Sequence, residues 1–207
     1  MKKFAFSFII IVNSLLLFTT QSDAQVMVGP SAGFTAAGLY TNDDNVYAGI
    51  NGQVGVTAHF QITNFLAVRP SVLYRFGSMA NSDDNTDKIS LNRIAIPVPI
   101  VYSHIFPNNG ILFGGVGPNF MYNLSGTQQN YYQNGNISFS GDTAQMQRFD
   151  VGLDVTGGYQ FSSGLSLSLF FNAGLSNISK VPGSTLRSLD AFGFSIGWMF
   201  GSASNEQ

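Results

Sequence analysis

The sequence predicts an all-β fold, a closed antiparallel up-and-down transmembrane β-barrel of about eight strands. Three observations lead to this prediction. Apolar and polar residues alternate with a period of two along several segments, as in strands whose two faces meet different surroundings. Only 10% of the 207 residues are charged although 44% are hydrophobic, which is too little charge to cover a water-soluble domain. Short and long connections alternate along the chain, as they do in membrane barrels.

The alternation is clearest in residues 149–161, where apolar side chains take the odd positions and polar or small ones the even positions, apart from Gly157. Similar alternation recurs in later and earlier segments, although residues 26–40 and 111–124 are less regular. The predicted strands lie at residues 26–40, 48–62, 65–76, 90–105, 111–124, 147–161, 165–176 and 188–200.

The connections between these segments fall into two classes. The tight ones lie near residues 63–64, 106–110 and 162–164. The longer ones are rich in Asn, Asp, Ser and Gly and lie at residues 41–47, 77–89, 125–146 and 177–187. Tight periplasmic turns and longer extracellular loops are typical of transmembrane barrels, so we expect both termini in the periplasm.

The distribution of charge separates a membrane barrel from a soluble barrel with an apolar interior. A membrane barrel keeps charges off its lipid face, where Arg or Lys at mid-bilayer costs about 2–4 kcal/mol. The strand charges that share the polar parity are Arg69, Arg75, Arg93, Asp150 and Asp154. Asp190 instead shares parity with Phe192, so we expect it in a loop or in the headgroup layer. The pattern favours the membrane barrel.

The N-terminus has the pattern of a secretory signal peptide. Lys2 and Lys3 precede an apolar run at residues 4–18, and Ser22 and Ala24 place small residues before a cleavage site. A transmembrane anchor is the alternative, but the run is shorter than the ~20 residues that a span needs. The predicted organisation is a cleaved signal peptide at 1–24, an outer-membrane β-barrel domain at 25–200 and a short C-terminal tail at 201–207.

Composition excludes several function classes. The net charge of −2 argues against a nucleic-acid partner, which needs clustered Lys and Arg. The chain has no Cys, and His59 and His104 are its only histidines. No Gly-x-Ser-x-Gly motif is present, so we predict no enzyme; a lipid-acting enzyme that uses His59 is the weakest alternative. We predict no cofactor and no metal, although the acidic segments 42–45 and 81–87 could offer oxygens to Ca²⁺ if they are more than solvated loop tips.

Two sets of residues are candidate functional positions. The inward charges Arg69, Arg75, Arg93, Asp150 and Asp154 are expected to form an ion-pair network in a side-chain-filled lumen, because buried charges need partners. We expect Arg69 and Asp154 near mid-barrel and the other three toward the extracellular end. A narrow pathway for small solutes or ions is the alternative. In the amide-rich loop at 127–135, Tyr131 and Tyr132 are candidates for contact with a partner.

Five segments resemble the PorT-like outer-membrane β-barrel domain family, which is typical of the Bacteroidota. They are the Ile-Pro-Val-Pro at 96–99, the Gly-Gly-Val-Gly-Pro at 114–118, and the segments 149–159, 174–178 and 193–200. The resemblance implies a role as an accessory component of protein secretion across the outer membrane. It also implies that the barrel assembly machinery reads the aromatic last strand, although the tail at 201–207 departs from the usual chain end. It supplies no catalytic or binding residues.

The leading prediction is a small integral outer-membrane β-barrel with a side-chain-filled lumen, which either has a structural or accessory role or binds a partner through its extracellular loops. A secretion accessory and a narrow channel are the alternatives. The expected partners are outer-membrane lipid, the barrel assembly machinery during insertion and, under the second hypothesis, secretion-system proteins.

Overall fold

The computed structural model describes residues 26–42, 46–83, 86–130, 134–141 and 144–201. The predicted signal peptide and all but the first residue of the predicted tail lie outside these ranges. No helix in the described ranges is long and apolar enough to cross a membrane. The strands are β1 (Val26–Thr41), β2 (Val46–Gln61), β3 (Leu66–Val68), β4 (Ser71–Asn81), β5 (Lys88–Pro97), β6 (Ile100–Ile105), β7 (Ile111–Gln129), β8 (Asn134–Asn136), β9 (Phe149–Gln160), β10 (Leu165–Gly174) and β11 (Leu186–Trp198).

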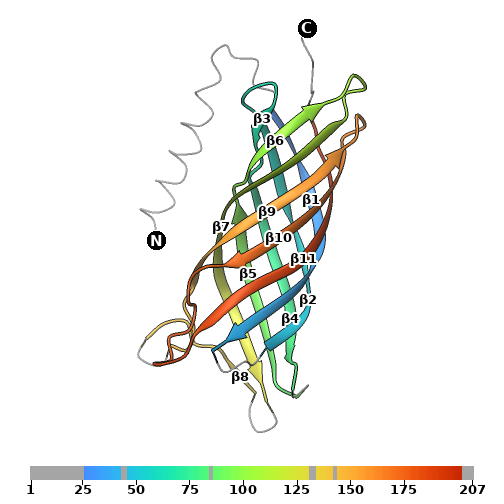
Figure 1. The fold of residues 1–207 in the computed structure, drawn as a ribbon. Helices are drawn as coiled ribbons and strands as arrows, with labels where there is room; N and C mark the ends of the chain where they lie inside the picture. The colour runs from blue at the N-terminus through green and yellow to red at the C-terminus, as the bar shows by residue number, and fades with distance from the viewer. Residues whose placement is uncertain (1–25, 43–45, 84–85, 131–133, 142–143, 202–207) are drawn as a thin grey trace, which may run out of the picture.

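These strands form one antiparallel sheet that closes on itself, because β1 pairs with β2 on one side and with β11 on the other (Figure 1). β3 continues into β4 and β5 continues into β6, so each pair of short strands forms one stave of an eight-stave ring. β8 pairs with β7 and lies outside the ring. The predicted closed antiparallel barrel is therefore confirmed.

Prolines account for the two interruptions, because proline cannot donate a ladder hydrogen bond. Pro70 separates β3 from β4, and Pro99 lies between β5 and β6. The neighbouring backbone groups remain paired. The Arg69 N–H donates to the Pro99 carbonyl at 3.0 Å, and the Val98 N–H donates to the Pro118 carbonyl at 2.9 Å. The wall therefore stays hydrogen-bonded where its strands are broken, as a bilayer requires.

The barrel has one end with short connections and one with long connections, as the sequence predicts. We call them the short-turn end, with connections 62–65, 106–110 and 161–164, and the long-loop end, with connections 42–45, 82–87, 130–148 and 175–185. The predicted loop at 77–89 is mostly strand, because β4 runs to Asn81 and β5 begins at Lys88. The strands extend there because Met79 pairs with Ile89 and both side chains are buried inside the barrel.

A β-bulge in β11 changes which residues face the lumen. Phe192 pairs with Ala36, but Asp190 pairs with the next residue of β1, Ala37, so the residue between Asp190 and Phe192 has no counterpart. A one-residue bulge exchanges the two faces of a strand on either side of it. Asp190 is therefore 3% exposed and lies inside the barrel, whereas Phe192 is 54% exposed on the outside. The expected position of Asp190 in a loop or headgroup layer is wrong for this reason.

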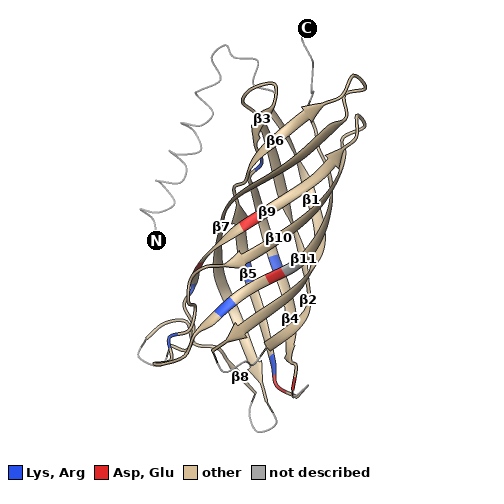
Figure 2. Cartoon of the chain, in the orientation of Figure 1, with Lys and Arg blue, Asp and Glu red and all other residues tan. Residues whose placement is uncertain are grey.

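The outer wall is apolar. Large side chains that lie more than a third exposed point outward from every stave, including Ile50, Val72, Ile100, Leu169 and Ile196. Charged residues occupy few positions on the strands (Figure 2). Apolar exposure of this extent suits contact with lipid.

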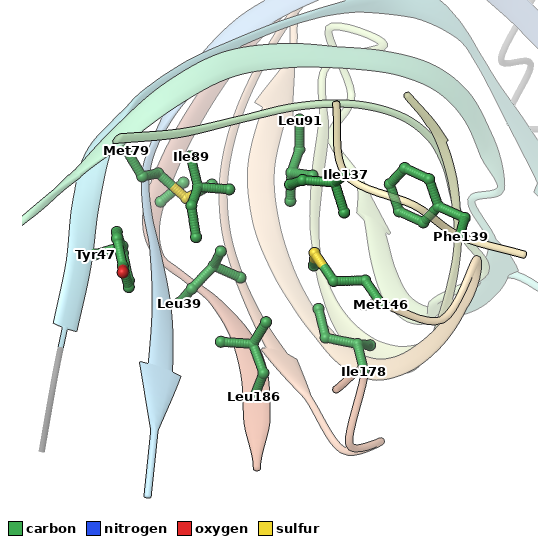
Figure 3. Close-up of a cluster of buried hydrophobic side chains, with 11 residues drawn as sticks. Leu39, Tyr47, Met79, Ile89, Leu91, Ile137, Phe139, Met146, Ile178 and Leu186 are labelled. Atoms are coloured by element: carbon green, nitrogen blue, oxygen red, sulfur yellow. The ribbon is translucent and has the colours of Figure 1, made fainter. Parts of the chain in front are cut away.

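Buried apolar side chains also cluster at the two ends of the lumen. The long-loop cap combines residues of the barrel wall with residues of the long loops. Its members are Ala37, Leu39, Tyr47, Met79, Ile89, Leu91, Ile137, Phe139, Met146, Ile178 and Leu186. Figure 3 shows side chains of this cap, such as Leu39 and Met146, pointing toward one another. The short-turn cap consists of Met27, Ile111 and Met199, with Ile105 packed against them. The polar lumen lies between the two caps.

Candidate functional site

The structure places all five predicted charged residues inside the barrel. Their relative exposures are 6% for Arg69, 2% for Arg75, 2% for Arg93, 1% for Asp150 and 3% for Asp154. The polar parity of their strands therefore faces the lumen, and their surroundings decide what they can do.

The ion pair found among the described residues joins Arg75 to Asp190. An η-nitrogen of Arg75 donates to a carboxylate oxygen of Asp190 at 2.5 Å. The Arg75 ε-nitrogen donates to Gln53 at 2.9 Å, and the guanidinium lies 5.4 Å from the centre of the Phe170 ring. The sequence pattern did not place Asp190 in the lumen, because strict alternation puts it on the lipid face. No residue type in this segment indicates a bulge.

Hydroxyl groups satisfy Asp150. Ser176 and Ser188 each donate a hydroxyl hydrogen bond at 2.6 Å to one of its carboxylate oxygens. Ser176 lies in the connection after β10, so this carboxylate ties a long loop to the lumen wall.

Arg93 has weaker contacts. It donates to the sulfur of Met121 at 3.7 Å, and its ε-nitrogen has no hydrogen-bond partner among the described residues. Neither Asp150 nor Asp154 lies within ion-pair distance of Arg93 in this part of the chain. The structure thus brings the five residues into one lumen without joining them in a continuous network of direct ion pairs.

Arg69 lies among neutral groups near the short-turn end. It donates to the Ser166 hydroxyl at 2.7 Å, and its guanidinium lies 4.0 Å from the centre of the Phe113 ring. It also contacts Nδ1 of His59 at 3.3 Å. Because Arg has no acceptor, His59 accepts through Nδ1 and carries its proton on Nε2, from which it donates to Gln61 at 2.9 Å. His59 is fully buried, and no carboxylate of the described residues lies within 4.0 Å of its ring nitrogens.

A small cavity occupies the lumen beside Arg69 and Arg75. Its volume is about 50 Å³. One water molecule needs roughly 10–15 Å³ of volume measured in this way. The cavity therefore has room for only a few water molecules or small ions. Its wall is rich in hydroxyl groups, from Ser31, Thr57, Ser71, Thr156, Ser166, Ser168 and Ser195.

The loop candidates are only partly described. Tyr131 and Tyr132 lie outside the described residues, as does part of each acidic segment, 42–45 and 81–87. Where the structure is described, no group of three or more His, Cys, Asp or Glu side chains is arranged to hold a metal ion.

Several solved structures are similar to this chain. Among solved structures, the chain is similar to the outer membrane protein OprG of Pseudomonas aeruginosa, with 9% identity over 87% of this chain and 97% of that chain, at a TM-score of 0.55. Neisserial surface protein A gives 14% identity over 84% and 97% of the chains, at a TM-score of 0.48. Ail, the attachment invasion locus protein of Yersinia pestis, gives 12% identity over 84% of this chain and 98% of that chain, at a TM-score of 0.41. At such identities the likeness to OprG concerns the fold alone.

A search of curated proteins gives no significant match. Residues 20–180, however, match the model of a family described as the outer membrane protein beta-barrel domain. The chain therefore belongs to the outer membrane protein β-barrel domain family and is a small outer-membrane β-barrel protein.

Proposed function

We propose that the protein is a non-conducting accessory barrel that binds a partner through its long loops. The observation that carries this proposal is the closed lumen. The lumen cavity that Arg69 and Arg75 line has a volume of about 50 Å³, and apolar clusters lie at both ends of the lumen. A continuous aqueous path would require polar walls from end to end, and buried apolar clusters oppose it.

The long-loop end supports the second half of the proposal. β7 and β8 form a hairpin outside the ring, and its tip is rich in exposed amides, including Gln129, Asn134 and Asn136. The connections at this end also include exposed polar residues such as Ser140. Polar side chains of this kind are not needed for contact with lipid. Loops held by a rigid scaffold are where binding residues concentrate. The proposed contact residues Tyr131 and Tyr132 lie outside the described residues, and in the sequence they fall between Gln129 and Asn134.

Conductance of the purified protein in planar bilayers tests the proposal. We expect no stable channel events under conditions in which a wide porin conducts. The matched variant replaces Phe139 and Met146, two loop residues of the long-loop cap, by Ala; it reports whether the cap contributes to closure. Large, long-lived channels in the unmodified protein would favour the solute-pathway alternative and overturn the proposal.

The second candidate function is an accessory role in protein secretion, as in the PorT-like family. The five resembling segments support it, and they include parts of β5, β7, β9 and β11. Secretion-system proteins should then co-purify with the tagged barrel, and deletion of the barrel should reduce secretion. Unchanged secretion after deletion would count against this role.

Export and assembly complete the proposal. We infer that residues 1–24 are removed as a signal peptide, so that N-terminal sequencing of the mature protein should begin at Gln25. We also infer that the barrel assembly machinery recognises the aromatic end of β11, where Trp198 and Phe200 are exposed. Replacing both with Ala should lower the amount of folded barrel in the membrane.

A further inference from the structure

The two arginines that line the lumen cavity differ in how their charge is balanced. Arg75 donates directly to the carboxylate of Asp190. Arg69 is equally enclosed, but its side-chain contacts are the neutral groups of Ser166, His59 and Phe113. Among the residues that the structure describes, no carboxylate lies within 4.0 Å of Arg69.

An enclosed guanidinium without a counter-charge is costly. Arg remains protonated in proteins, and an isolated charge moved from water into a low-dielectric interior loses several kcal/mol or more of solvation. Asp154 shares the cavity wall but lies more than 4.0 Å from the Arg69 guanidinium. The position of Arg69 therefore favours a small mobile counter-charge beside it.

The cavity next to Arg69 has the chemistry to receive such a charge. Thr57 links Ser31 and Ser71 in a chain of hydroxyl hydrogen bonds of 3.1 and 2.9 Å. These hydroxyls, with Ser166 and Ser168, line the cavity. A hydroxyl can rotate to donate toward an anion, so the wall offers several donors in addition to the guanidinium. At about 50 Å³, the space suits a monatomic ion with some of its hydration water.

We propose that the lumen binds one small monovalent anion of the halide class between Arg69 and the serine and threonine hydroxyls of this cavity. The ion acts as the counter-charge of Arg69 and stabilises the closed barrel. Because apolar caps lie at both ends, the ion enters when the barrel folds and exchanges slowly afterwards.

The test refolds the urea-unfolded full-length mature protein into detergent micelles with chloride, bromide or the bulky anion gluconate at equal ionic strength. Ligand linkage predicts a Tm higher by about 5–10 °C in a halide at a concentration about 100 times its dissociation constant. Crystals grown from the bromide sample should show an anomalous peak within hydrogen-bond distance of the Arg69 guanidinium.

Two variants separate this site from general salt effects. Arg69→Gln removes the charge and keeps an amide that can donate to Ser166, so the Tm should lose its dependence on halide. Lys88→Gln removes an exposed cation at the start of β5 and should keep that dependence. Should Arg69→Gln fail to fold, bromide diffraction of the unmodified protein still decides. Equal Tm values in all three anions, or a cavity that holds only water in the bromide crystals, would overturn the site and leave the non-conducting barrel intact.

Discussion

At the residue scale, the lumen is stabilised by specific partners for individual charges. Arg75 is neutralised by Asp190 and also donates to Gln53. Asp150 accepts hydrogen bonds from two serine hydroxyls. Since polar groups in an enclosed lumen cannot rely on bulk water, removing one partner leaves the other unsatisfied.

Replacing Asp190 by Asn should therefore be strongly destabilising. The substitution keeps the shape of the side chain but removes the carboxylate that forms the ion pair with the buried Arg75 guanidinium. We expect a loss of about 3–5 kcal/mol in the free energy of unfolding, measured by urea titration in lipid vesicles. Asp83→Asn, in an exposed loop, is the control and should change stability by less than about 0.5 kcal/mol. Equal effects of the two substitutions would contradict a stabilising ion pair.

At the element scale, bulges set which side chains of a strand face the lumen. The bulge in β11 brings Asp190 inside while Phe192, Phe194 and Ile196 remain on the lipid side. β7 has a similar irregularity, because its pairing with β5 shifts between Asn92 and Arg93. Such bulges keep the barrel wall hydrogen-bonded where the apolar residues of a strand change from odd to even positions.

Deleting Ala191, the unpaired residue of the β11 bulge, should prevent correct folding. Without it, either Asp190 faces lipid or the aromatic residues beyond it face the lumen. We expect the heat-modifiable gel mobility of a folded barrel to disappear. Inserting one Ala between Val181 and Pro182, in an exposed loop, changes chain length by the same amount and should leave the mobility shift intact. A folded deletion variant would show that the bulge is dispensable.

At the scale of the whole molecule, the apolar belt and the unequal ends together define how the barrel sits in a membrane. The belt belongs to all the staves of the ring, so the molecule presents apolar surface in every direction around its axis. The long-loop cap and the β7–β8 hairpin give one end a larger polar extension than the other.

A charge placed in the belt should reduce stability in a lipid bilayer. Leu169 is 50% exposed at the middle of β10, and Val181 is 52% exposed in a loop. Leu169→Arg should cost about 2–4 kcal/mol of unfolding free energy because the guanidinium meets hydrocarbon. Val181→Arg makes the same change outside the belt and should cost little. If urea titration in vesicles gives equal losses, residue 169 does not lie in the hydrocarbon layer.

The orientation of the barrel can be read from cysteine labelling, because the natural chain contains no Cys. Ser140 is exposed at the long-loop end and Ser163 at the short-turn end. In intact cells, a membrane-impermeant maleimide should label Ser140→Cys and not Ser163→Cys. After the outer membrane is permeabilised, both should react. Labelling of Ser163→Cys alone in intact cells would reverse the proposed orientation.

Local sequence patterns are sufficient to predict the barrel and the residues on each of its two faces. Alternation in segments such as 149–161 predicts strands, and the polar parity of Arg69, Arg75 and Arg93 places these residues in the lumen. Both predictions succeed because the side-chain period of a strand is fixed by backbone geometry. The unequal connections predict the two kinds of end for the same local reason, since turn residues act within a few positions of themselves.

Which charged residues contact one another depends on the closed barrel. Asp190 is 115 residues from Arg75 in the chain. By strict alternation from Phe192, it would face the lipid and not the lumen. A bulge, which depends on the register of two neighbouring strands, reverses this parity. The neutral surroundings of Arg69 also depend on β2, β7 and β10 meeting around the ring. Partners across a closed barrel are set by register and closure, which no local pattern encodes.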